Sequence, residues 1–327
     1  MFTLSHKINS LAICFALLIL LLSGEALASQ KVDETLEADL DSLIQIEHVS
    51  GSAKIIGWEN AQVKVEGTLG DDTEEFIFER NGKSIEIRVE IKQKSSWGGW
   101  NSGSVDGDKL VIYVPKQSRV EYDTTNADVE LENIEGGSDI EVVNGDIDAK
   151  GLSGRVQLES VNGDINAKAI NGDVRVETVN GDIELEQVSG RTLKASSVNG
   201  GLQAVSSAEE LYAETVNGDI EFTLQEISAV DAQTVNGSIE LSMSLQSGAV
   251  VKAGSVGGSI TLHLPKQTEA KFDIEAHAGG SIRNRLTADK PNKAEYGPRS
   301  WLSFNKGSPD ATVDITTVHG TVVLTAQ

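Results

Sequence analysis

The chain has 327 residues and a formal charge of −23, from 50 acidic and 27 basic side chains. This charge excludes nucleic-acid binding through a general basic surface, because such a chain repels phosphates. Hydrophobic residues make up 39%, which is enough for a packed core, and 32 glycines with only 5% aromatic residues favour a β-rich, turn-rich chain.

Residues 1–28 carry the features of a secretory signal peptide. Lys7 gives a positive start, residues 11–22 are almost entirely apolar, and the sequence A-L-A stands directly before Ser29. The apolar run is short for a membrane span, and Cys14, the only cysteine, lacks the small preceding residue that lipidation requires. We therefore expect cleavage before Ser29 and an exported mature chain, in the periplasm, at the cell surface or secreted, that is at most peripheral to a membrane.

A pentapeptide repeat dominates the middle of the chain, and its asparagines are spaced 18 or 19 residues apart. A looser series with Ser-Gly or Asn-Gly lies between these copies, so that two units of about nine residues make one larger repeat. A short fixed period of this kind is typical of a solenoid. VNGDI stands at 143–147, 161–165, 179–183 and 216–220, with the variants INGDV at 170–174, VNGGL at 198–202, VNGSI at 235–239 and VGGSI at 256–260.

The apolar residues of each unit predict a short strand followed by a bend. They fall at positions n, n+2 and n+5, as in Val156, Leu158 and Val161, where the step of two is the strand period and the step of three marks the bend. Gly permits the corner that follows, and Asn tolerates a left-handed conformation there. Because one unit cannot bury its apolar side alone, equivalent strands should stack one coil apart. The expected columns are Ile147, Ile165, Ile183, Leu202, Ile220, Ile239 and Ile260, and Val143, Val161, Val179, Val198, Val216, Val235 and Val256.

We therefore predict an all-β, single-domain parallel β-solenoid, or β-helix, with about 18–19 residues per coil. The chirality of parallel crossovers favours the right-handed form. The regular VNGDI-repeat β-helix spans 126–265. Residues 29–125 form an N-terminal β region continuous with the solenoid, with a loop at 95–108, and 266–327 form C-terminal strands with a Pro-containing loop at 289–310. Both flanks look like the same fold with weaker repeats.

Shared corners and the repeats identify a family resemblance. The sequence P-K-Q at 115–117 and 265–267 marks two equivalent points at which Pro ends a strand. With the signal peptide, the Gly-Trp pair at 57–58, the VNGDI repeats and a worn copy at 318–322, the chain resembles a bacterial family of secreted adhesin-type proteins of unknown function. The resemblance covers about residues 30–327. It implies a β-helix fold and an envelope or surface location, and no known reaction.

Motifs for catalysis or metal binding are not found in the sequence. No histidines stand at metal-ligand spacing, and no cysteine lies in the mature chain. The chain has no G-x-S-x-G, phosphate loop or dinucleotide fingerprint. We expect the histidines of the mature chain to be ordinary exposed side chains, and we predict no catalytic residue, no cofactor-binding residue and no metal site. These histidines are His48, His263, His277 and His319.

Asp146, Asp164 and Asp182 occupy the same place in successive coils, with Asp219 two coils further on. Like charges about 4.8 Å apart repel by about 1 kcal/mol in water-like surroundings, and Ca²⁺ could relieve that repulsion. The simpler interpretation, which we favour, is that each Asp caps turn amides while water and salt screen its charge. We expect the repeat asparagines to form a ladder of side-chain amides from coil to coil, rather than a sugar-binding edge.

Two further sets of residues have alternative interpretations. Arg155, Asp173 and Arg191 lie on adjacent coils and predict exposed ion pairs, each worth under about 1 kcal/mol. Aromatic side chains could stack on sugar rings, but aromatics beside Gly also pack over the open end of a solenoid, which is the interpretation we favour. The tryptophans concerned are Trp58, Trp97, Trp100 and Trp301.

Two classes of function remain. The first is a non-catalytic exported cell-envelope protein, an adhesin or β-helical scaffold with an unknown carbohydrate or protein partner. The alternative is a carbohydrate-active β-helix enzyme, a polysaccharide lyase or hydrolase, because β-helices host such enzymes. An enzyme of that kind needs paired carboxylates or clustered Lys and Arg, and the repeats show no basic cleft. A chain of charge −23 also repels acidic polysaccharides, so we favour the first class.

Overall fold

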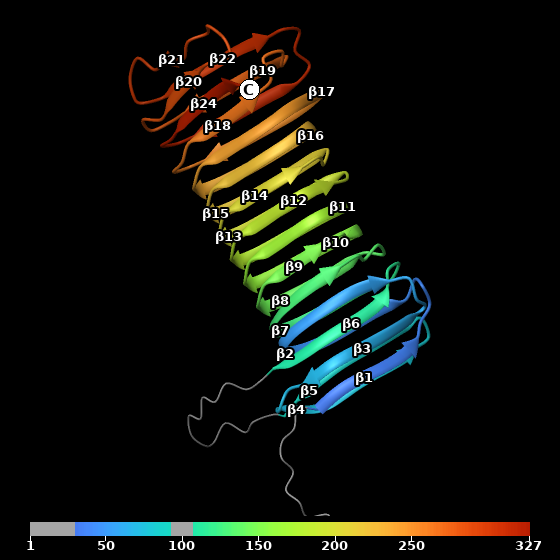
Figure 1. Cartoon of the computed structure of the whole chain (residues 1–327). Coiled ribbons are helices and arrows are strands. Elements are labelled where there is room, and N and C mark those ends of the chain that lie inside the picture. The colour runs from blue at the N-terminus through green and yellow to red at the C-terminus, as the bar shows by residue number, and fades with distance from the viewer. Residues whose placement is uncertain (1–29, 93–106) are drawn as a thin grey trace, which may run out of the picture.

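The computed structural model describes residues 30–92 and 107–327, and their regular elements are all β-strands, as predicted. The expected signal peptide lies outside these residues, as does the expected loop at 95–108 apart from its last two positions. Among the described residues, no helix has the length and apolarity needed to cross a membrane. The strands stack like rungs along one elongated body, with the N-terminal and C-terminal strands at opposite ends (Figure 1).

The strands fall into three groups along the chain. The N-terminal group is β1 (Gln30–Glu37), β2 (Leu43–Trp58), β3 (Gln62–Leu69), β4 (Thr73–Asn81), β5 (Ser84–Ile91) and β6 (Asp108–Pro115). The central group is β7 (Arg119–Glu132), β8 (Ser138–Asn144), β9 (Ile147–Lys150), β10 (Ser153–Asn162), β11 (Ile165–Asn180), β12 (Ile183–Ser189), β13 (Thr192–Asn199), β14 (Leu202–Ser206), β15 (Glu210–Asn217), β16 (Ile220–Asn236), β17 (Ile239–Ser255) and β18 (Ile260–Leu264). The C-terminal group is β19 (Ala270–Ala276), β20 (Ser281–Asn284), β21 (Asn292–Lys293), β22 (Ser300–Lys306), β23 (Thr312–Thr317) and β24 (Thr321–Ala326).

The central strands pair in parallel, each with the equivalent strand of the next coil. On one side, which we call the first face, Val156 of β10 lies opposite Val174 of β11. On the other side, the second face, Ile165 of β11 lies opposite Ile183 of β12. The long strands β11, β16 and β17 run round a corner and contribute to both faces. The predicted stacking of equivalent strands is therefore confirmed.

The hydrophobic core lies between the two faces. The predicted isoleucine column is confirmed, because each of its seven members is at most 1% exposed. Complete burial of such a side chain contributes about 1.5–3 kcal/mol. Leu152, Ile170 and Val188, which precede the other corner of the coil, are also at most 1% exposed. The isoleucine column thus runs through the central coils without interruption.

The predicted valine column is wrong, because its seven members lie on the surface with exposed fractions of 38–45%. The residue before each of these valines faces inward instead. The Ser160 hydroxyl donates to the Gly145 carbonyl oxygen at 3.2 Å, and the Thr178 hydroxyl donates to that of Gly163 at 3.1 Å. Since side chains alternate along a strand, an inward Ser160 places Val161 outside. The strand period of two therefore continues from Val156 and Leu158 to Ser160. The step of three residues from Leu158 to Val161 does not mark a further inward position.

The glycine of the VNGDI bend is needed for space in each copy, and only Gly145 of the first copy also has a positive φ, of +148°. A Cβ atom on Gly163 would lie 1.9 Å from the carbonyl oxygen of Gly145 in the preceding coil. Among the described residues, no asparagine of these pentapeptides has a positive φ, so the expectation of left-handed Asn is wrong. The other corner does use the freedom of glycine, since Gly190 has a φ of +133°.

Both ends of the stack depart from the parallel repeat that we expected there. At the N-terminal end β1 pairs with β3, β3 with β6 and β4 with β5, all antiparallel. The β4–β5 turn is short, with Gly82 at a φ of +65°, and short turns can join only antiparallel strands. The two Pro corners do match, because the Ser118 amide donates to Pro115 O at 2.9 Å and the Thr268 amide to Pro265 O at 3.0 Å.

The prediction of a Pro-containing loop at 289–310 is wrong for the second half of that range. It contains β22, which pairs antiparallel with β19. Leu302 and Phe304 alternate inward along β22, and the Phe304 ring stacks on Phe272 with a centroid distance of 4.6 Å. This apolar alternation covers the end of the core beyond β19, where the described residues form no further coil.

Replacing Ile183 with Asp tests the core column. A carboxylate at this position would be buried without a partner, and we expect a loss of several kcal/mol that spreads to neighbouring coils. Val198→Asp is the matched control, because Val198 is 42% exposed, and its loss should stay below about 1 kcal/mol. Thermal melting of the mature chain measures both. Equal losses in the two variants would mean that the inward and outward positions are assigned wrongly.

Candidate functional site

A groove of about 760 Å³ runs along the first face, across seven strands from β2 to β15. Two rows of outward side chains line it, two residues apart on each strand, with buried residues such as Ser160 between them. We call them the acidic row and the valine row. The acidic row is Glu47, Asp123, Glu141, Glu159, Glu177 and Glu214, interrupted by Ser196. The valine row is Val49, Val143, Val161, Val179, Val198 and Val216, interrupted by Thr125.

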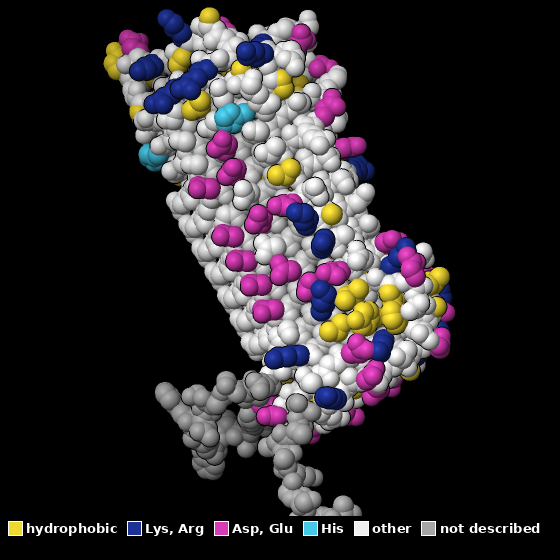
Figure 2. Space-filling model, in the orientation of Figure 1, with side chains coloured by type: hydrophobic (Ala, Val, Ile, Leu, Met, Phe, Trp, Pro, Cys, Tyr) yellow, Lys and Arg dark blue, Asp and Glu magenta, His cyan; other side chains and the backbone are white. Residues whose placement is uncertain are grey.

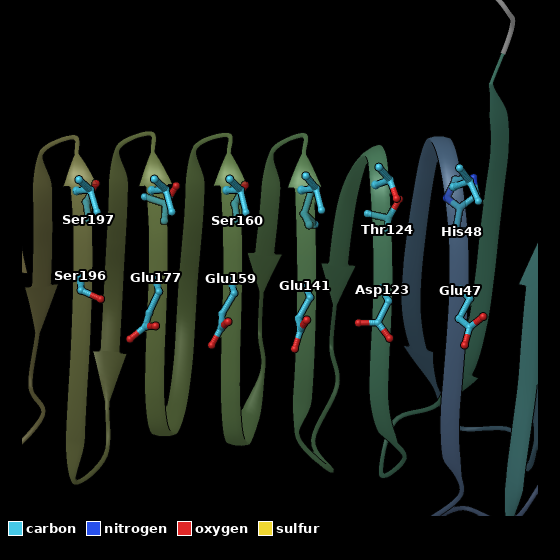
Figure 3. A pocket seen from close by; sticks show the side chains of 18 of the residues that line it. Glu47, His48, Asp123, Thr124, Glu141, Glu159, Ser160, Glu177, Ser196 and Ser197 are labelled. Atoms are coloured by element: carbon cyan, nitrogen blue, oxygen red, sulfur yellow. The ribbon is translucent and has the colours of Figure 1, made fainter. Parts of the chain in front are cut away.

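The acidic row is kept in line by the strand register. Glu47 lies opposite Asp123, which lies opposite Glu141, and the pairing continues through Glu159 to Glu177. These five carboxylates stand side by side on successive strands (Figure 3). Neighbouring strands are about 4.8 Å apart, so the row is a line of like charges. Acidic side chains also recur from coil to coil over the face seen in Figure 2.

Only part of this negative charge is compensated. Arg175 lies between two members of the row, with its guanidinium 2.6 Å from Glu177 and 3.7 Å from Glu159. Within residues 30–92 and 107–327, no basic side chain forms an ion pair with Asp123 or Glu141. Burial and the neighbouring carboxylates raise the pKa of both groups. The groove therefore holds an excess of negative charge around Asp123 and Glu141, whereas Glu47 at its N-terminal end lies 3.4 Å from the guanidinium of Arg88.

His48 lies at the N-terminal end of the groove but is only 2% exposed, so the expectation of an exposed side chain is wrong for this histidine. Its Nδ1 lies 2.9 Å from the Tyr122 hydroxyl and its Nε2 lies 3.0 Å from Oδ2 of Asp108. Oδ1 of Asp108 accepts hydrogen bonds from the Gly70 amide at 2.6 Å and the Thr73 hydroxyl at 3.0 Å. This network joins strands that are distant in the sequence, and its burial favours a structural role.

The pKa values of this network follow from the same contacts. Burial acts to raise the pKa of Asp108, but hydrogen bonds from His48 and the Gly70 amide outweigh it, so that this pKa is lowered. Burial also raises the pKa of Tyr122. Asp108 is thus held as a charged carboxylate and Tyr122 as a neutral phenol, which keeps the network intact at neutral pH.

The repeat asparagines and aspartates form the contacts that we expected at the bend. The Asn162 side-chain amide donates to Oδ1 of Asn144 at 2.9 Å, and Asn180 donates to Asn162 at the same distance. The ladder begins one coil earlier than the VNGDI repeats and continues to Asn236. The backbone amide of Asp164 donates to Oδ1 of Asp146 at 2.8 Å, so each carboxylate caps an amide of the next coil. In the described part of the chain, no group of three His, Cys, Asp or Glu side chains is placed to hold a metal ion.

The other sequence-based candidates are less well supported. Arg155 lies opposite Asp173, but among the described residues neither forms an ion pair, and Arg191 instead contacts Glu210 at 3.6 Å. The remaining candidates are histidines and tryptophans with local partners. His263 pairs with Glu240 and His277 with Glu275, His319 is exposed, Trp58 donates to the Gln62 carbonyl oxygen, Trp301 contacts Arg299, and Trp97 and Trp100 lie outside the described residues.

The acidic row was not predicted, although the sequence contains a signal for it. Four of its members stand three residues before a repeat asparagine, in the pattern E-x-V-N, as in Glu159 and Asn162. A position that recurs at this spacing must fall in one column, because the asparagines do. The more regular aspartates after the glycine are the stronger signal in the sequence, and they recur beside these glutamates.

We predict that calcium has no specific effect on the chain. Because each repeat Asp already accepts an amide hydrogen bond, CaCl₂ and NaCl at matched ionic strength should give the same melting temperature. The same comparison on Asp164→Asn is the control. A rise that only calcium produces, and that this variant loses, would show instead that the aspartates form a site.

We also predict that Glu141→Gln stabilises the chain at neutral pH. Since the folded-state pKa of Glu141 is raised, its ionised form opposes folding, and the deficit disappears as the pH falls below the ordinary Glu value of 4.5. Thermal melting at pH 7 and pH 4 measures the difference. Glu221→Gln, on the second face outside the acidic row, makes the same change in charge. An equal gain from Glu221→Gln would show that overall charge alone is responsible.

Comparison with known proteins places this fold in a family. Among solved structures, the chain is similar to a "putative cell adhesion protein" from Clostridium sporogenes (14% identity, 91% of this chain and 100% of that chain, TM-score 0.21). It is also similar to a "putative adhesin" from Bacteroides fragilis (11% identity, 91% of this chain and 98% of that chain, TM-score 0.33). A third similar structure is a "putative lipid binding protein" from Parabacteroides distasonis (12% identity, 90% of this chain and 96% of that chain, TM-score 0.40). Curated protein sequences give no match. Residues 42–325 match the family described as Toastrack DUF4097, and the chain therefore belongs to that family.

Proposed function

We propose that the chain is an exported, non-catalytic protein of the cell envelope that acts as a rigid binding scaffold, in the manner of an adhesin. The observation that carries this proposal is the groove on the first face. Its two rows repeat acidic side chains and valines over seven strands, interrupted by Ser196 and Thr125, and His48 at one end is buried in a structural network. Such a repeating surface differs from a reacting centre, which needs unlike groups brought together at one place. A surface of this kind suits the recognition of an elongated partner.

The expected signal peptide supports export, because residues 1–28 combine a positive start, an apolar run and a cleavage sequence. We further infer that the stacked coils form one β-solenoid of the right-handed form, since crossovers between parallel strands favour that hand. In a solenoid each coil supports its neighbours, so the groove keeps one shape along its length. The proposed scaffold role rests on this rigidity.

Two measurements test the proposal. Cell fractionation should find a mature chain that begins at Ser29 outside the cytoplasm. The purified mature chain should not cleave pectin, alginate, peptidoglycan or chondroitin, because the acidic row repels polyanions and its carboxylates repeat at one spacing. Reproducible turnover of any of these polymers, lost on replacing one acidic or basic residue, would favour a carbohydrate-active enzyme. A chain that stays in the cytoplasm with residues 1–28 attached would contradict export.

A further inference from the structure

We propose that the groove binds an extended polypeptide segment of about eight or nine residues in which basic and apolar side chains alternate. This inference rests on the proposed binding function and names its partner. Three features of the groove carry it: the exposed valine row, the uncompensated charge of the acidic row, and the narrow distance between the two rows.

The valine row gives the groove its apolar side. Five of its members, on five consecutive strands of the first face, have exposed fractions of 38–42%. A single exposed valine needs no explanation, but a continuous row is an apolar surface that a partner can cover. These valines face outward because the residue before each of them faces inward, a buried Val142 in one case and a hydroxyl that bonds inward in the other four, as in Thr178 and Gly163. Folding therefore cannot bury them. They are Val143, Val161, Val179, Val198 and Val216.

The acidic row decides the sign of the partner's charge. Asp123, Glu141 and Glu214 have no ion-pair partner among the described residues, and the raised pKa values of the first two reflect both burial and repulsion. A partner with Lys or Arg would relieve that repulsion, whereas an anionic polymer or an anionic lipid surface would increase it. The groove therefore selects a cationic occupant with apolar groups beside its charges.

The distance between the rows decides the conformation of that occupant. Glu159 and Val161 are two residues apart on one strand, which is about 6.6–6.8 Å. A helix, about 10–12 Å across, is too wide to lie between the rows. Successive side chains of an extended chain point in opposite directions, so one set can reach the valine row while the other reaches the acidic row.

The length of the groove sets the length of the segment. Six steps of about 4.8 Å separate the seven strands that line it, which gives about 29 Å. At about 3.3–3.4 Å per residue, an extended segment of eight or nine residues spans this distance. Side chains on one side of the segment are spaced differently from the strands of the groove. Because both rows are nearly continuous, the segment does not need to match each of its side chains to one strand.

The test uses the mature chain and a fluorescent peptide of about nine residues that alternates Lys and Val. Fluorescence anisotropy at low salt should show binding that weakens with added salt and with falling pH, as the carboxylates become protonated. The double variant Glu141→Gln/Glu159→Gln should bind about 3- to 10-fold more weakly. The matched control Glu184→Gln/Glu221→Gln, on the second face, should stay within about 2-fold.

Two comparisons test the apolar side of the groove. Val161→Thr/Val179→Thr, at exposed positions and with unchanged melting, should weaken binding about 2- to 10-fold. A peptide that alternates Lys and Ser should bind more weakly than the Lys–Val peptide. Equal binding by these two peptides, or an equal effect of the control variant on the second face, would overturn the proposal in favour of general charge attraction. An absence of binding would also overturn it, without affecting the export and turnover measurements that test the proposed function.

Discussion

The close approach of successive coils at the VNGDI bend is the constraint on which the rest of the structure depends. The Gly163 amide donates to the Asn180 carbonyl oxygen at 3.1 Å, and a Cβ on Gly181 would lie 2.1 Å from the Gly163 carbonyl oxygen. Any larger residue would push the coils apart and break the backbone hydrogen bonds on both faces. Each coil must therefore repeat the bend of the one before it, which explains why the pentapeptide recurs.

The bend also determines what the surface presents. An inward hydroxyl such as that of Ser197 bonds the glycine carbonyl oxygen of the preceding coil, so the valine that follows is turned outward. The amide ladder and the Asp caps then fix the register, and this register brings the carboxylates of the first face into line. The repulsion within the acidic row is tolerated because many backbone hydrogen bonds hold the strands that carry it. The groove is thus a consequence of stacking.

The sequence predicted what the repeat specifies locally. The period of 18 or 19 residues predicted the parallel pairing, and the alternation around Ile165 predicted the core column. The outward turn of Val161 was missed because an apolar side chain was assumed to be buried, whereas the hydroxyl of Ser160 has the stronger need for an inward partner. The antiparallel ends could not be predicted from the repeat, because their partners, such as β19 and β22, are set by covering the open core rather than by a period.

The distribution of charge along the groove follows from two arginines and a buried network, with Arg88 3.4 Å from Glu47 at the N-terminal end of the row. Arg175 offsets part of the charge of Glu159 and Glu177, and among the described residues no cation forms an ion pair with Asp123 or Glu141. The uncompensated carboxylates lie next to the strands that the His48 network joins, because Asp123 follows Tyr122 on β7. A rigid groove loses little conformational entropy when it is occupied, and most of the ordering cost then falls on the partner. Discrimination between partners therefore depends on whether their own side chains alternate in charge and apolarity.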